Sequence, residues 1–66
     1  MNSGATMRVR LYWLDGRVEE LKQEVPSDTA LIVRNHDGGH RHFTFAEEFD
    51  EGFAIFWEEE VSEQRH

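Results

Sequence analysis

Cysteine is absent from this chain, and proline occurs only once. Without thiols the protein cannot form a disulfide framework or a thiolate metal site, which excludes a secreted disulfide-rich domain and a redox role. Long hydrophobic runs are also absent, because the longest apolar run, residues 53–57, is far short of the ~20 residues that a membrane span needs. We therefore expect a cytoplasmic protein that has no membrane partner.

Basic residues are missing from most of the last third of the sequence. Between His42 and Gln64 there are eight acidic residues and no Lys or Arg, and the net charge of the whole chain is −7. Such a charge disfavours direct binding to nucleic acid, because proteins bind the phosphate backbone through clustered Lys and Arg. The simplest interpretation is a solvated acidic surface that keeps a small protein soluble.

The functional alternative is that this acidic C-terminal face binds a basic protein partner. In the extreme case the protein would mimic nucleic acid and inhibit a DNA- or RNA-binding protein. Salt should weaken such an interface, because it screens the charges. The predicted partner-binding residues are Glu47, Glu48, Asp50, Glu51, Glu58, Glu59 and Glu60.

The chain is long enough for one domain only. A chain of 66 residues buries only ~60% of the surface that its unfolded form exposes, so the core must be small. We expect a disordered lead-in over residues 1–6, a single β domain over 7–61 and a frayed tail over 62–66.

The start of the domain has the pattern of a β-hairpin. Residues 7–13 begin with alternating apolar and polar side chains, and Asp15-Gly16 is a strong turn signal. A three-residue connection with Gly16 in the left-handed conformation places Arg10 opposite Glu20. Opposite charges then meet across the two strands, which supports this register.

Residues 17–25 are compatible with two structures. Their Glu- and Lys-rich composition and the spacing of their apolar residues suit a short helix that ends before Pro26. The Asp-Gly pair directly after a clear strand favours a chain reversal and a second strand. We predict the strand and keep a short helix packed on the sheet, an α+β fold, as the alternative.

The middle of the sequence predicts a second hairpin. An Asp37-Gly38 turn would pair Ile32 with Phe43, whereas a Gly38-Gly39 turn would pair Ile32 with Phe45. Both registers place the same side chains on the same face, because they differ by an even number of residues.

A third hairpin is expected around residues 50–52. With three loop residues, Phe45 lies opposite Trp57. The whole chain then reads as a small all-β domain, a five-stranded antiparallel meander that forms a curled sheet or a small barrel. The side chains expected to share its interior are Val9, Leu11, Ile32, Phe43, Phe45 and Trp57.

Two of the expected strands are apolar on both faces, which a sheet with one solvated face does not need. A helix over residues 17–25 or the curvature of a barrel could cover the second face. The alternative is a homodimer, because large exposed apolar patches usually mark interfaces. The predicted self-association residues are Leu31, Val33, Ala46 and Phe56.

Three histidines near the second turn are candidates for a metal site, because imidazole and carboxylate are common ligands for Zn²⁺ and similar ions. Strand alternation places His36 on the face opposite His40 and His42. The best ligand set is therefore His40, His42 and Asp37, which a partner or water would have to complete.

The sequence contains no catalytic motif and no cofactor motif. The serines lack a convincing neighbouring base, and no glycine-rich loop precedes a helix to bind phosphate. We therefore predict a non-enzymatic protein without a cofactor.

Overall fold

The computed structural model describes residues 4–60, and within this range it contains strands and no helix. The strands are β1 (Thr6–Tyr12), β2 (Val18–Glu20), β3 (Val25–Pro26), β4 (Leu31–His36), β5 (Gly39–Asp50) and β6 (Phe53–Glu58). The all-β fold class is therefore confirmed. Since this part of the chain is entirely non-helical, it contains no helix of the length and apolarity needed to cross a membrane.

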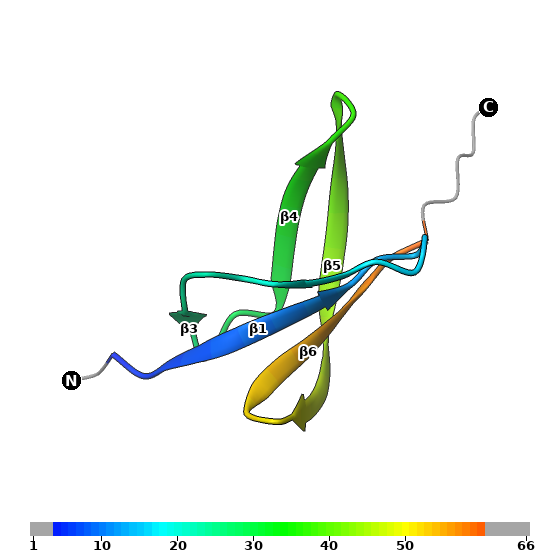
Figure 1. Cartoon of the computed structure of the whole chain (residues 1–66). Coiled ribbons are helices and arrows are strands. Elements are labelled where there is room, and N and C mark those ends of the chain that lie inside the picture. Colours follow the sequence, from blue (N-terminus) through cyan, green and yellow to red (C-terminus); the bar gives the residue numbers. More distant parts are fainter. Residues whose placement is uncertain (1–3, 61–66) are drawn as a thin grey trace.

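The strands form one curled, mixed sheet with the shape of a half-barrel (Figure 1). Its main path has the order β2-β1-β6-β5-β4, and β3 pairs with β1 off this path. One pairing departs from the predicted antiparallel meander, because β1 runs parallel to β6. The first strand of the domain therefore lies beside the last.

The structure describes only part of the predicted lead-in and none of the predicted tail. β1 begins at Thr6, so the predicted lead-in over residues 1–6 overlaps this strand by one residue. Residues 1–3, Val61 and the predicted frayed tail over 62–66 lie outside the described residues.

The first hairpin has the predicted register. The backbone N–H of Trp13 donates to the carbonyl of Arg17 at 2.9 Å, and Gly16 between them has a φ of 96°. Only glycine adopts this angle readily, because it has no Cβ. Arg10 lies opposite Glu20, as expected. Residues 17–25 contribute β2 and the first residue of β3, so the alternative helix does not form.

The central hairpin settles the choice between the two predicted registers. Asp37 has a φ of 54° and Gly38 a φ of 77°, and two central residues with positive φ are typical of a type I′ turn. Ile32 consequently lies opposite Phe43.

The third hairpin differs from the prediction. Glu51 and Gly52 have φ values of 55° and 84°, and Asp50 pairs directly with Phe53. The connection is therefore a two-residue turn, and the predicted three-residue loop is wrong. A one-residue change in register turns every side chain of a strand to the other face.

This change reverses the two faces of β6. Phe56 is fully buried opposite Phe45, whereas Trp57 is 51% exposed. A bulge between Phe45 and Phe49 does not restore the predicted arrangement. Across the bulge, β5 advances four residues, from Phe45 to Phe49, while β6 advances two, from Phe56 to Ala54. The difference is an even number of residues, so the side chains stay on the same faces.

The core lies on the inner face of the curled sheet. Four of its side chains, those of Val9, Leu11, Phe43 and Phe56, are the largest that are fully buried. Ile32 and Phe45 are partly buried against this core. All the predicted interior residues except Trp57 thus lie in the core or pack against it.

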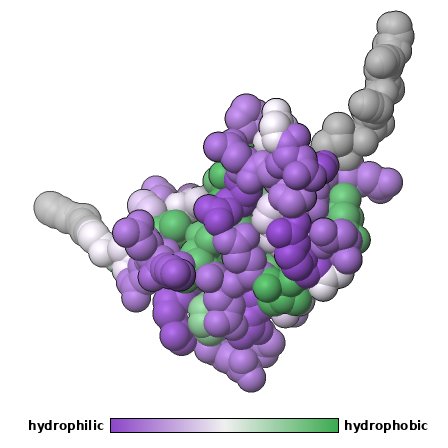
Figure 2. Space-filling model, turned by 45° about the horizontal axis from the view of Figure 1, so that its top comes forward, coloured by the Kyte–Doolittle hydropathy of each residue, from purple (hydrophilic) through white to green (hydrophobic). Residues whose placement is uncertain are grey.

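The face drawn in Figure 2 is mostly polar, with apolar side chains exposed between the polar ones. The large apolar residues that are exposed are Leu14, Val18, Leu31, Val33, Phe49 and Trp57.

Truncation of the two neighbouring aromatic residues on β6, Phe56 and Trp57, should destabilise the protein to very different extents. We expect Phe56→Ala to lower the free energy of unfolding by about 3–5 kcal/mol, because it leaves a cavity in the core. Trp57→Ala should cost about 1 kcal/mol, the scale of one surface aromatic pair. Urea unfolding followed by circular dichroism measures both values. If Phe56→Ala does not fold, Phe56→Leu replaces it, and a larger loss for Trp57→Ala would contradict the observed register.

Candidate functional site

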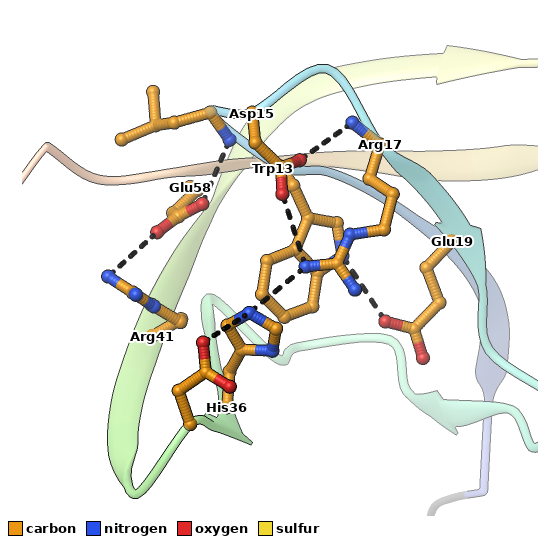
Figure 3. Close-up of polar contacts among 9 residues, drawn as sticks. Trp13, Asp15, Arg17, Glu19, His36, Arg41 and Glu58 are labelled. Carbon is orange, nitrogen blue, oxygen red and sulfur yellow. Dashed lines mark hydrogen bonds and ion pairs between the residues drawn. The ribbon is translucent and has the colours of Figure 1, made fainter.

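One group of polar contacts surrounds Trp13, which follows β1 (Figure 3). The guanidinium carbon of Arg17 lies 4.0 Å from the centroid of the indole ring, a cation–π geometry. The rings of His36 and Phe43 meet the indole edge-on, with centroid distances of 5.2 and 4.9 Å. The indole Nε1 donates to Glu19 Oε1 at 3.3 Å, so the buried ring has a partner for its one polar atom.

Charged side chains connect this group to both edges of the sheet. Arg34 on β4 forms an ion pair with Glu19 on β2. His36, also on β4, lies 3.4 Å from Arg17 Nη2 and 3.3 Å from Asp37 Oδ2 through its Nε2 atom. β2 and β4 do not pair through their backbones within residues 4–60. Side chains therefore connect the two edges where a closed barrel would have backbone hydrogen bonds.

A buried carboxylate completes the group. Glu58 is only 9% exposed, and its Oε1 accepts a hydrogen bond from the backbone N–H of Leu14 at 2.8 Å. Its Oε2 lies 3.9 Å from Arg41 Nη1. A hydrogen bond and a cationic neighbour together offset the cost of burying the charge.

These side chains line a small cavity of about 150 Å³. Every buried side-chain polar atom in the described part of the chain has a hydrogen-bond partner. The buried polar atoms around this cavity are therefore held by other protein groups. The lining residues are Trp13, Leu14, Asp15, His36, Arg41 and Glu58.

Asp15 is the group near this cavity with a shifted pKa. The backbone N–H of Arg17 donates to Asp15 Oδ1 at 2.9 Å, and this bond is the main cause that lowers the pKa of the carboxyl. The Arg17 side chain, with Nη2 3.3 Å from Oδ2, lowers it further. Both contacts favour the ionised form.

A second ionic cluster is centred on Arg10, which is 8% exposed. Its guanidinium lies 3.1 Å from carboxylate oxygens of Glu20, Asp50 and Glu51. The Tyr12 side chain, followed by Glu51, raises the pKa of Arg10 above its already high value. The predicted Arg10–Glu20 pair is present, but the sequence did not predict the two acids from the β5–β6 turn.

The predicted acidic residues do not form one continuous face. Glu58 is buried and paired, so it is removed from the predicted partner-binding set. Asp50 and Glu51 lie before the start of β6 and share Arg10, whereas Glu59 and Glu60 are exposed beyond its end.

The remaining two acids, Glu47 and Glu48, are exposed in the bulge of β5. Glu47 has a φ of 58°, which is uncommon for a residue other than glycine. The acids are therefore distributed along β6, with Glu47 and Glu48 beside its middle and the others at its two ends.

The structure does not assemble the predicted metal ligands. His40 and His42 lie opposite Asn35 and Val33 on one face, whereas the Asp37 carboxylate is next to His36 on the other. No group of three His, Asp or Glu residues in the described range could hold a metal ion. The predicted separation of His36 from the other two histidines is confirmed.

The predicted self-association residues are only partly exposed. Leu31 and Val33 are 50% and 48% exposed, and Ala46 is half-buried. Phe56 is fully buried in the core, because the two-residue turn points it inward, and it is removed from this set.

The outer face carries a feature that the sequence did not predict. One row of directly paired residues crosses the whole main path of the sheet. We name this set the outer row, and it consists of Val18, Tyr12, Trp57, Thr44 and Leu31. The Tyr12 and Trp57 rings stack at a centroid distance of 4.7 Å, and Val18, Trp57 and Leu31 are each about half exposed.

No protein-family model matches the chain, and no curated protein or solved structure matches it either. Only the geometry of the chain itself bears on its function.

The lowered pKa of Asp15 should appear as a pH-dependent contribution to stability. A carboxyl whose pKa is lowered by folding stabilises the protein above its ordinary pKa of 3.8, and this contribution disappears as the pH falls through the folded-state value. We expect Asp15→Asn to lower the melting temperature slightly at neutral pH. The difference from the unmodified protein should shrink as the pH falls below about 4. A difference that is constant over this range would contradict the assignment.

Proposed function

We propose that this chain is a non-enzymatic interaction protein that binds a basic protein partner through the outer row. The observation that carries the proposal is the row itself, which presents a stacked Tyr–Trp pair between exposed aliphatic side chains. Tyrosine and tryptophan are enriched at protein interfaces because they bury a large apolar area and retain one polar group.

Exposed apolar residues that occur singly are normal, but a contiguous set is not. The outer row is contiguous because each member is the direct cross-strand partner of the next. Tyr12 and Thr44, which separate the half-exposed apolar members, are themselves partly buried. A partner would cover an apolar strip that crosses five strands.

The negative charge of the protein favours a basic partner. Glu20 lies on the same face as Val18, and Glu59 follows Trp57 by two residues, so exposed carboxylates border the row at two places. Arg10 is nearly buried and is already surrounded by three carboxylates. With a net charge of −7, the protein would attract a basic partner and repel an acidic one.

The polar group around Trp13 supports a binding role over a catalytic one. His36 contacts both an aspartate and an arginine, and Glu58 is held by a backbone N–H and Arg41. These contacts stabilise the two edges of the sheet and leave no side chain poised to attack a substrate.

A peptide selection tests the proposal. A random peptide library would be panned against the protein, and fluorescence anisotropy would measure the affinity of the selected peptides. We expect peptides that combine Lys or Arg with an aromatic or aliphatic residue. Trp57→Ala should weaken their binding by roughly 10- to 30-fold, because an interface tryptophan commonly contributes about 2 kcal/mol.

The matched control is Leu14→Ala, which truncates another apolar side chain that is more than half exposed and lies outside the outer row. It should leave the affinity unchanged. Binding should also weaken at about 1 M salt, where the screening length falls to roughly 3 Å. Selection of acidic peptides, or equal effects of the two substitutions, would overturn the proposal.

A further inference from the structure

The second feature of interest is the free edge of the sheet at β4. In the part of the chain that the structure describes, β4 pairs with β5 and with no other strand. Figure 1 shows β4 beside β5, and β4 is the last strand of the main path. An edge strand presents unpaired N–H and C=O groups that another strand can bind.

The register identifies which backbone groups of β4 are free. The two-residue turn makes His36 and Gly39 a hydrogen-bonded pair, and at the other end Phe45 N–H donates to the carbonyl of Ala30 at 3.1 Å. In an antiparallel pair such residues alternate with residues whose backbone groups point away from the partner strand. The N–H and C=O groups of Leu31, Val33 and Asn35 therefore point away from β5.

This edge has only part of the usual protection against pairing. The side chains of Arg34 and His36 reach Glu19 and Arg17, but within residues 4–60 no second strand pairs with the β4 backbone on this side. β4 contains no proline, no lysine and no bulge in its pairing with β5. The residues with free backbone groups also have uncharged side chains on the outer face, two of them apolar and about half exposed.

We propose that β4 pairs antiparallel with β4 of a second copy of this chain, across a two-fold axis at Val33. This inference does not rest on the proposed function, because it uses backbone groups at the edge of the sheet, although Leu31 also belongs to the outer row. In this arrangement Val33 lies opposite Val33 of the other copy, and Leu31 lies opposite Asn35. Each of these residues both donates and accepts a backbone hydrogen bond, so the surface is complementary to itself.

The charges along β4 favour contact with a second copy of the chain more than the charges elsewhere on the surface do. Two chains that each carry −7 repel one another, but β4 contains no Asp or Glu. The side chain of its one arginine is already paired with Glu19. The two-fold arrangement sets Arg34 opposite Ile32, so no like charges lie directly opposite one another. β4 thus brings no carboxylate of its own to the contact, and the Glu19 carboxylate beside it is paired with Arg34.

Solution mass as a function of concentration tests the pairing. We expect light scattering to show a mass that doubles as the protein concentration rises. Val33→Lys should abolish the doubling, because it places two ammonium groups at the two-fold axis. The matched control is His42→Lys, which adds the same side chain on the same face at the β5 partner of Val33. His42→Lys should still dimerise.

Amide hydrogen exchange distinguishes edge pairing from other contacts. At high concentration the N–H groups of Leu31, Val33 and Asn35 should exchange more slowly, whereas those of Ile32 and Arg34 should not change. If Val33→Lys does not fold, Asn35→Lys replaces it. A mass that stays monomeric at all concentrations would overturn the proposal, as would a dimer that survives Val33→Lys or is lost only in Trp57→Ala.

Discussion

The parallel pairing of β1 with β6 is the constraint on which the rest of the structure depends. Within the described residues it joins the first hairpin to the other strands of the main path. It aligns Tyr12 with Trp57 on the outer face and Leu11 with Phe56 on the inner one, so it creates both the outer row and the centre of the core. Arg10 reinforces this junction, because its guanidinium contacts carboxylates from β2 and from the β5–β6 turn.

Turn chemistry made much of the fold predictable. The Asp-Gly pair set the register of the first hairpin correctly, because glycine supplies the positive φ that such a turn needs. For the second hairpin the sequence left two registers open, and the one with the Asp37-Gly38 turn forms. The loop length predicted for the third hairpin was wrong, because Glu51 adopts a positive φ, which glutamate rarely does. The sequence could not correct this error, since β6 is apolar on both faces and fits either orientation. The parallel β1–β6 pairing also has no local signal, because the two strands are far apart in the sequence.

The candidate site was less predictable than the fold. Strand alternation separated His36 from His40 and His42 correctly, because that argument needs only the period of a strand. The group around Trp13 draws on β1, β2, β4 and the end of β6, so it exists only once the sheet has curled. The acidic residues show the same limit. Their number was evident from the sequence. The burial of Glu58 was not, because its partners, the Leu14 N–H and Arg41, are distant in the sequence and meet it only in the folded sheet.

The position of β1 beside β6 also governs the order in which the polypeptide can fold. β4, β5 and β6 are consecutive and are joined by two-residue turns, so they can associate through nearby contacts as they leave the ribosome. β1 is synthesised before them but has no central partner until β6 emerges. Its apolar side chains therefore keep part of their exposure until β6 is available, and transiently exposed apolar surface of this kind favours aggregation.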